Sequence, residues 1–124
     1  MKKILFIEDE PALQRAVIHI LNTEGYKTFS ATDGEAGVAL ARKELPDLIL
    51  LDLIIPKKDG FSVLAEIKQD KQMASIPVIV LTNLEGSADV ERALILGATT
   101  YLVKTNYQIE EIIEKIRNVL GPVQ

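Results

Sequence analysis

One carboxylate in this sequence stands where a carboxylate is costly. The segment DLILLDLIIP, residues 47–56, places Asp52 among Leu and Ile side chains. A carboxylate in apolar surroundings loses much of its hydration, so it needs a partner for its charge or gives that charge up. With a suitable partner, an aspartate in such a place can act as a nucleophile that forms an acyl phosphate.

Other polar residues also stand at the ends of apolar runs. They are far apart in the sequence and comprise Glu8, Asp9, Thr82, Asn83 and Lys104. If the runs are parallel strands, their carboxyl ends meet at one edge of the sheet, where such folds place their sites. We therefore expect two or three carboxylates, one hydroxyl and one ammonium to gather around Asp52.

This set of groups is suited to magnesium-assisted phosphoryl transfer. Crowded carboxylates repel one another, and a hard cation relieves that repulsion. Oxygen ligands without His or Cys favour Mg²⁺, with Mn²⁺ as an alternative. Phosphoryl transfer needs alignment and charge neutralisation, which the cation and Lys104 would supply around Asp52. Thr82 offers a hydroxyl that can donate to a phosphoryl oxygen.

The elements that must position these groups follow from an alternation of short apolar runs with amphipathic segments. Three runs are almost wholly apolar, as strands covered on both faces are. The segments between them repeat apolar residues at helical spacing. Five such units in 124 residues indicate an α/β three-layer sandwich with a parallel sheet in the middle. The predicted strands are residues 3–7, 27–31, 47–52, 77–82 and 100–104.

Capping signals mark the start of several predicted helices. Pro11 suits the first position of a helix. Thr32 with Glu35, and Thr105 with Gln108, each match the capping box. We therefore expect helices to begin at these three places.

Composition excludes several classes of function. The chain has no Cys and one His, so it offers neither a disulfide framework nor a His or Cys metal cluster. Its formal net charge is −4 and no basic stripe stands out, so we expect no direct contact with nucleic acid. No apolar run approaches the ~20 residues that span a bilayer. The default is a cytoplasmic domain without membrane contact.

The motifs at these positions resemble the receiver domains of two-component response regulators, in particular chemotaxis-type single-domain receivers. They are the pair Glu8–Asp9, LLDLIIPKKDG around Asp52, VIVLTN with Thr82, and GATTYLVK ending at Lys104. The similarity covers nearly the whole chain. It implies one receiver domain over residues 1–124 with the flavodoxin-like (βα)5 fold and strand order 2-1-3-4-5. Since the chain ends just after its last predicted helix, we expect a stand-alone receiver.

The resemblance also implies roles for the residues that would handle the phosphoryl group. Asp52 would be the phosphoacceptor, and Lys104 would pair with the phosphoryl group or, before phosphorylation, with Asp52. Asp9 and Asp52 would bind Mg²⁺ directly, together with the backbone carbonyl of Ile54. Glu8 would act mostly through water.

Thr82 and Tyr101 resemble the coupled switch pair of the family. In that arrangement the hydroxyl moves to the phosphoryl group and the aromatic ring turns inward. The face formed by the fourth helix, fifth strand and fifth helix would then change. The resemblance implies a signalling switch rather than an enzyme. Its phosphoryl donor would be a sensor histidine kinase or a phosphotransfer protein, and its target an unidentified downstream protein. We expect a monomer or a weak dimer.

The sequence departs from the family pattern at several positions. Thr105 stands where the family usually has Pro, often preceded by a cis peptide bond. A cis peptide bond before a residue other than Pro costs ~3–4 kcal/mol. We therefore expect the peptide bond between Lys104 and Thr105 to be trans. Asn83 is larger than the usual residue beside the phosphoryl group. Ile54 and Leu84 are apolar where they would flank that group. We hypothesise that they hinder a hydrolytic water and prolong the life of the phosphoaspartate.

Other functions compatible with a related fold fit less well. A phosphorylation-independent pseudo-receiver, which binds protein partners only, is the alternative, although such domains usually lose an acidic or Lys position that is kept here. A haloacid-dehalogenase type of phosphatase needs an Asp two residues after its nucleophile, where this chain has Ile54. A flavin binder needs a phosphate-cradling loop after the first strand, and IEDEPA is acidic instead.

Overall fold

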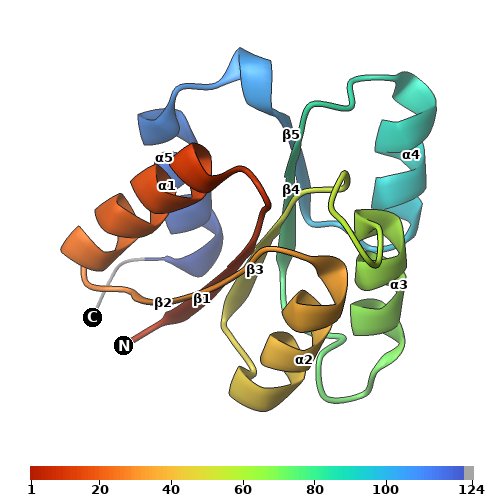
Figure 1. The fold of residues 1–124 in the computed structure, drawn as a ribbon, viewed down its shortest axis with the longest axis horizontal. Coiled ribbons are helices and arrows are strands. Elements are labelled where there is room, and N and C mark those ends of the chain that lie inside the picture. Colours follow the sequence, from red (N-terminus) through yellow and green to blue (C-terminus); the bar gives the residue numbers. More distant parts are fainter. Residues whose placement is uncertain (122–124) are drawn as a thin grey trace.

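The computed structural model describes residues 1–121, so residues 122–124 of the predicted domain lie outside the described residues. Five parallel strands form one sheet in the order β2-β1-β3-β4-β5, which confirms the flavodoxin-like α/β fold (Figure 1). The strands are β1 (Lys3–Ile7), β2 (Lys27–Ala31), β3 (Leu48–Leu51), β4 (Val78–Thr82) and β5 (Thr100–Val103). The helices are α1 (Pro11–Thr23), α2 (Gly34–Glu44), α3 (Gly60–Gln69), α4 (Ser87–Ile95) and α5 (Ile109–Leu120).

The inner strands are buried on both faces, which explains why their sequences show no alternation of polar and apolar residues. Every residue of β3 and β4 is buried, as is every residue of β1 after Lys3. The predicted strands match β1 and β2 residue for residue and differ from the other three by no more than one residue at either end. The apolar runs therefore locate the sheet accurately.

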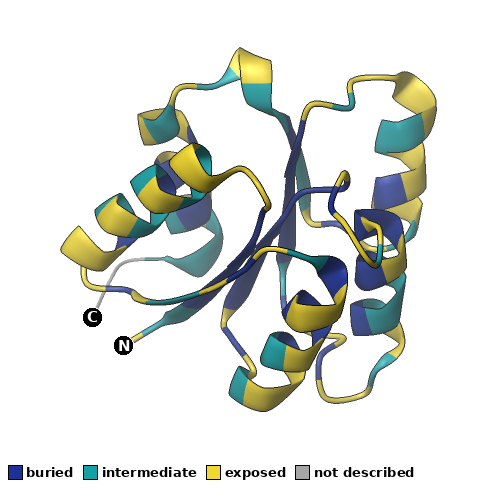
Figure 2. Ribbon diagram, viewed as in Figure 1, coloured by how far each residue is buried: buried dark blue, intermediate teal, exposed yellow. Residues whose placement is uncertain are grey.

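Helices cover both faces of this sheet. In Figure 1, α1 and α5 lie on one side, while α2, α3 and α4 lie on the other. Figure 2 shows that each helix is buried toward the sheet and exposed away from it. None of the helices in residues 1–121 has the length and apolar character needed to cross a membrane. Between the sheet and helices α1 and α5, the buried apolar side chains include Ile4, Phe6, Val17, Leu21 and Ile112. Between the sheet and helices α2, α3 and α4, they include Leu5, Ile49, Val38, Leu64 and Ala93.

Two predicted capping boxes are wrong, although a helix does begin close to each. The N-cap of α2 is Asp33, not Thr32, and its side chain accepts a hydrogen bond from the backbone N–H three residues later at 2.8 Å. The N-cap of α5 is Gln108, and its own N–H donates to Glu111 Oε1 at 2.8 Å. At α2 the adjacent Asp33 takes the cap in place of Thr32, whereas at α5 Thr105 lies inside the 3₁₀ turn Lys104–Asn106 and Gln108 takes the cap.

The loop that follows β5 is a short 3₁₀ turn, Lys104–Asn106, so Thr105 lies inside that turn. The peptide bond between Lys104 and Thr105 is trans, as expected for a bond that does not precede Pro. Pro11 occupies the first turn of α1, which confirms its predicted position. Lys104 is the first residue of this turn and directly follows the last residue of β5.

Candidate functional site

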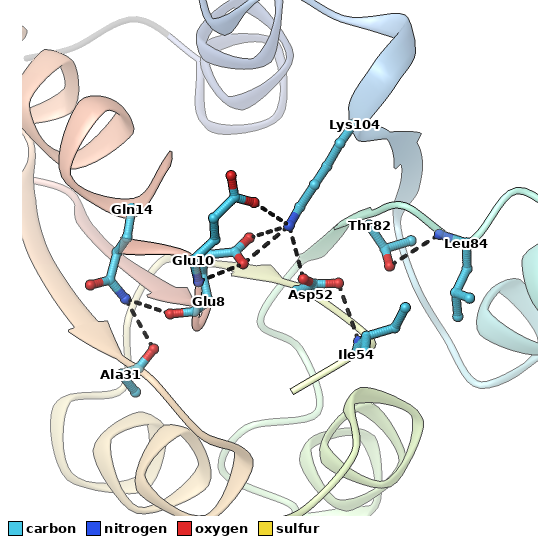
Figure 3. Close-up of polar contacts among 9 residues, drawn as sticks. All are labelled: Glu8, Glu10, Gln14, Ala31, Asp52, Ile54, Thr82, Leu84 and Lys104. Atoms are coloured by element: carbon cyan, nitrogen blue, oxygen red, sulfur yellow. Dashed lines mark hydrogen bonds and ion pairs between the residues drawn. The ribbon is translucent and has the colours of Figure 1, made fainter. Parts of the chain in front are cut away.

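The polar residues that follow the strands meet at the carboxyl edge of the sheet (Figure 3). Glu8 follows β1, Asp52 follows β3 and Lys104 follows β5. Backbone hydrogen bonds continue past the strand ends: the Asp52 N–H donates to the carbonyl of Ile7 at 3.0 Å, and the Glu8 N–H donates to that of Ala31 at 2.9 Å. The sheet therefore fixes the points from which both carboxylates leave the backbone.

Lys104 is the charge partner that the buried aspartate requires. Its Nζ lies 2.9 Å from Asp52 Oδ2, 2.9 Å from Glu8 Oε1 and 3.5 Å from Glu10 Oε2. Only 11 % of its side chain is exposed. Burial works to lower the pKa of Lys104, but hydrogen bonds to Glu8 and Asp52 outweigh it and raise the pKa above its ordinary value. The ammonium therefore stays charged at physiological pH.

Both carboxylate oxygens of Asp52 have partners, although the residue is only 4 % exposed. Oδ2 accepts from Lys104 Nζ, and Oδ1 accepts from the backbone N–H of Ile54 at 3.2 Å. These two hydrogen bonds hold the Asp52 carboxylate in one orientation at the rim of the sheet, as a nucleophile requires.

Glu8 is fully buried, and only one of its two carboxylate oxygens accepts a hydrogen bond in the part of the chain that the structure describes, whereas both oxygens of Asp52 do. Its Oε2 accepts from Lys104 Nζ at 3.1 Å and from the Glu10 N–H at 3.2 Å. Its Oε1 makes no hydrogen bond within residues 1–121, although it lies close to Lys104 Nζ. Burial raises the pKa of Glu8 to about 7, against the hydrogen bond from Lys104, and the charge of Asp52 adds to the rise.

These carboxylates fit a divalent cation. Oxygen atoms of Glu8, Asp9 and Asp52 lie within 4.8 Å of one another, and Asp9 is exposed while the other two are buried. Glu8 Oε1 makes no hydrogen bond within residues 1–121 and has only the Lys104 ammonium, 2.9 Å away, beside it, so this buried oxygen can also serve a cation. A donor set made of oxygen alone suits Mg²⁺ or Mn²⁺. Ile54 contributes its N–H to Asp52, and its carbonyl stays a predicted ligand.

The side chains of Thr82 and Tyr101 both form hydrogen bonds with the backbone of Leu84. The Leu84 N–H donates to Thr82 Oγ1 at 3.4 Å, and the Tyr101 hydroxyl donates to the Leu84 carbonyl at 2.8 Å. Thr82 is fully buried beside the site, and Tyr101 is half-buried on β5. Burial raises the pKa of Tyr101, and the charges of Asp89 and Asp52 raise it further. A movement at Thr82 can therefore reach Tyr101 through a single backbone segment.

The sequence matches a known family over most of this fold. Residues 4–117 match the response regulator receiver domain. The chain belongs to the response regulator receiver domain family. The DNA-binding dual master transcriptional regulator RpaA of Synechocystis sp. is 41% identical to this receiver domain over 120 residues, which are 97% of this chain and 49% of that protein. The receiver domain thus spans about half the length of this relative.

Solved structures of other receiver domains superpose closely on this one. The Mn²⁺-bound response regulator Rcp1 is 36% identical, with a TM-score of 0.87 over 100% of this chain and 98% of that one. The receiver domain of the sensor histidine kinase PA1611 from Pseudomonas aeruginosa PAO1, with magnesium in its active-site cleft, is 30% identical, with a TM-score of 0.86 over 97% of this chain and 98% of that one. Metal in both neighbours agrees with the acidic cluster of this receiver domain.

The residues predicted to control access to the phosphoryl group differ in their exposure. In this receiver domain Asn83 is exposed, and Ile54 is 55% exposed. Leu84 is half-buried and packs against the core on the α2, α3 and α4 side of the sheet. Ile54 therefore presents apolar surface next to Asp52, whereas the Leu84 side chain is partly covered by the core.

Sequence reasoning missed two residues that shape this receiver site. Glu10 reaches Lys104, and Gln14 Nε2 donates to the backbone carbonyls of Glu8 at 2.9 Å and Ala31 at 3.1 Å (Figure 3). Gln14 thereby ties the loop after β1 to the end of β2. Glu10 could have been found from its place beside the acidic pair, but nothing in the helical pattern of α1 marks Gln14.

A tight contact supports the loop that follows Asp52. The Gly34 N–H, at the start of α2, donates to the carbonyl of Pro56 at 3.1 Å. A Cβ atom at Gly34 would lie 1.9 Å from the carbonyl oxygen of Lys58, which no side chain can tolerate without movement. The start of α2 therefore presses against the loop that carries Ile54.

Proposed function

We propose that this receiver domain is a phosphorylation-dependent signalling switch with Asp52 as the phosphoacceptor. The buried contact between Asp52 and Lys104, beside the carboxylates of Glu8 and Asp9, is the observation that carries the proposal. Receiver domains take phosphoryl groups from histidine kinases or phosphotransfer proteins, and they act as switches rather than as enzymes that turn over an outside substrate. The donor here is a protein phosphohistidine.

The arrangement supports an in-line transfer. A carboxylate oxygen of Asp52 attacks phosphorus, the P–N bond to the donor imidazole breaks, and the imidazole nitrogen keeps the electron pair. Asp9 and Asp52 would hold Mg²⁺ directly and Glu8 mostly through water, and the cation would supply neutralisation of the charge on the phosphoryl oxygens. Lys104 moves its ammonium from Asp52 to a phosphoryl oxygen, and the buried Thr82 hydroxyl donates to another.

The same step explains how phosphorylation changes the surface. Thr82 Oγ1 accepts from the Leu84 N–H, so a shift of the hydroxyl toward the phosphoryl group pulls on the segment between β4 and α4. The Leu84 carbonyl accepts from Tyr101, so this segment and the ring move together. Phosphorylation then shifts an existing equilibrium toward a form in which the ring lies inward and the face of α4, β5 and α5 changes.

Helix α4, which belongs to the face formed by α4, β5 and α5, carries exposed apolar side chains. Leu94 and Ile95 are 48% and 76% exposed, and they border a groove of about 590 Å³. The acidic side chains of Glu85 and Glu91 line the same groove. This combination favours a protein partner that presents apolar side chains flanked by Lys or Arg. The groove is lined by Glu85, Ser87, Val90, Glu91, Leu94 and Ile95.

Intact mass spectrometry after incubation with acetyl phosphate and Mg²⁺ tests the phosphoacceptor. One phosphoryl adduct is expected in the parent, and none in Asp52→Asn or without Mg²⁺. Asp47→Asn is a matched control, because Asp47 is exposed and bonds the Lys3 N–H at the other end of the sheet. The parent without an adduct would contradict the proposal, and loss of metal binding as well would favour the pseudo-receiver.

A further inference from the structure

Glu10 has an unusual position for a residue that precedes a helix. It is the N-cap of α1, yet its side chain caps no backbone N–H of that helix. Its N–H donates to Glu8 Oε2, and its own Oε2 lies 3.5 Å from Lys104 Nζ (Figure 3). Its side chain is 55% exposed. Among the three carboxylates near the Lys104 ammonium, Glu10 is thus the one exposed to solvent.

The contact with Glu10 takes up the third N–H donor of the Lys104 ammonium. A lysine ammonium has three N–H groups. In this structure Nζ lies within reach of Asp52, Glu8 and Glu10, one carboxylate for each of its donors. Glu8 and Asp52 belong to the acidic cluster that fits a cation, and Glu10 does not. A metal at the cluster would therefore compensate two of the three carboxylates and leave the charge of Glu10 at the entrance.

We propose that Glu10 is a specificity-determining residue that disfavours small, highly charged phosphoryl donors. This inference rests on the proposed function, because it concerns the donor used by Asp52. The negative charge of Glu10 repels an incoming anion and holds Lys104 back from it. A phosphohistidine on a large protein partner can offset this repulsion with contacts elsewhere, whereas a small molecule in solution has no such contacts.

Two small donors of different charge make the effect measurable. Acetyl phosphate is mainly a dianion at neutral pH, and phosphoramidate carries a net single negative charge. In the first reaction a carboxylate oxygen of Asp52 forms the new P–O bond while the P–O bond to acetate breaks, and acetate leaves with the electron pair. In the second reaction the P–N bond breaks, and the nitrogen, already protonated in the zwitterion, leaves as ammonia.

The experiment measures second-order rates of adduct formation for the parent and Glu10→Gln by intact mass, with both donors and saturating Mg²⁺. Loss of one like charge near 4 Å in water should speed the reaction with acetyl phosphate roughly three- to tenfold. The gain with phosphoramidate should be smaller. Added potassium chloride should accelerate the parent more than Glu10→Gln, because salt screens the repulsion that the variant lacks.

Glu44→Gln is the matched control, since it removes one charge from the formal −4 of the chain at the far end of the sheet, where Glu44 pairs with Lys3. It should react as the parent does. Glu10→Asp keeps the charge and should keep the donor preference. Equal rates and equal salt dependence in the parent and Glu10→Gln would overturn the inference, as would a slower variant. Absence of an adduct in every protein would instead overturn the proposed function, and the inference with it.

Discussion

The hydroxyl of Tyr101 donates to the backbone carbonyl of Leu84 at 2.8 Å. The N–H of the same residue donates to Thr82 Oγ1, so Leu84 is held from both sides. In receiver domains a switch requires that an event at the phosphoryl group reach a distant surface. Here the path is short, since it consists of one hydroxyl, one backbone segment and one ring.

Removal of the Tyr101 hydroxyl should loosen the segment between β4 and α4 without harming the phosphoacceptor. Tyr101→Phe is expected to lower the free energy of unfolding by about 1 kcal/mol, the value of one hydrogen bond. Urea denaturation measures this loss, and intact mass checks that Asp52 still forms its adduct. Tyr107→Phe is the control, because the Tyr107 hydroxyl makes no hydrogen bond among residues 1–121. An equal loss of stability in both variants would contradict the assignment.

The raised pKa of Tyr101 predicts a dependence of stability on alkaline pH. Burial disfavours the phenolate, with Asp89 and Asp52 adding to the effect. A group whose pKa is raised by folding stabilises the protein below its unfolded pKa, ordinarily about 10, and loses that contribution as pH rises through the folded value. Burial also raises the pKa of Tyr26, so tyrosinate absorbance should show two late-titrating phenols in the parent and one in Tyr101→Phe. Identical titrations of the two proteins would contradict this.

Lys104 should support both the chemistry and the fold. Lys104→Met leaves the buried carboxylates of Asp52 and Glu8 without their ammonium and is expected to destabilise the protein by about 2–3 kcal/mol at neutral pH. Mg²⁺ should recover part of this loss by binding the same carboxylates. Thermal unfolding with Mg²⁺ and with chelator measures the recovery. A variant as stable as the parent in chelator would show that the ammonium is not needed for the fold.

The apolar residues around Asp52 predict a long-lived phosphoaspartate. Ile54 is 55% exposed, so Ile54→Asn introduces a polar side chain without disturbing the core. The variant should lose its acyl phosphate several-fold faster, because a polar side chain can hold the attacking water. Decay followed by intact mass after donor removal tests this, with Leu84→Asn as the second variant. Unchanged decay in both variants would contradict the hypothesis.

The substitution Gly34→Ala should displace the loop that follows Asp52 and so impair the site. The added Cβ would lie 1.9 Å from the carbonyl oxygen of Lys58, so the loop after Asp52 must shift. We expect Gly34→Ala to cost about 2–3 kcal/mol and to slow phosphorylation. Gly86→Ala is the control, since the nearest atom to its Cβ would be Asp89 Oδ2 at 3.6 Å. Chemical denaturation and the rate of adduct formation separate the two variants.

Apolar runs locate β1, β3 and β4 because strands buried on both faces are apolar almost throughout, whereas the edge strands β2 and β5 are only partly buried. The same logic places Asp52 and Lys104 at one edge, since parallel strands end on the same side. The order of the strands was implied by the family resemblance, because an alternating pattern does not say which strands are neighbours. Structure was needed to show that Lys104 lies within 2.9 Å of Asp52.

Loops are the part that sequence reasoning predicted less well. Both Thr32 and Asp33 are good capping residues, and the geometry of the loop, rather than residue type, selects Asp33. Glu10 and Gln14 belong to the site through contacts with residues distant in the sequence, Glu10 with Lys104 and Gln14 with the carbonyl of Ala31. Such contacts depend on tertiary packing, and no periodicity along the chain records them.

The hydrogen bond between Lys104 and Glu8 joins residues 96 positions apart. Lys104 is delivered by β5, which lies at the edge of the sheet beside β4. Edge elements open locally at a lower free-energy cost than the buried centre. Each opening of β5 would carry the ammonium away from Asp52 while the rest of the sheet stays folded. If Lys104 takes part in phosphoryl transfer, local opening of this edge strand would slow that transfer while the global stability stays the same.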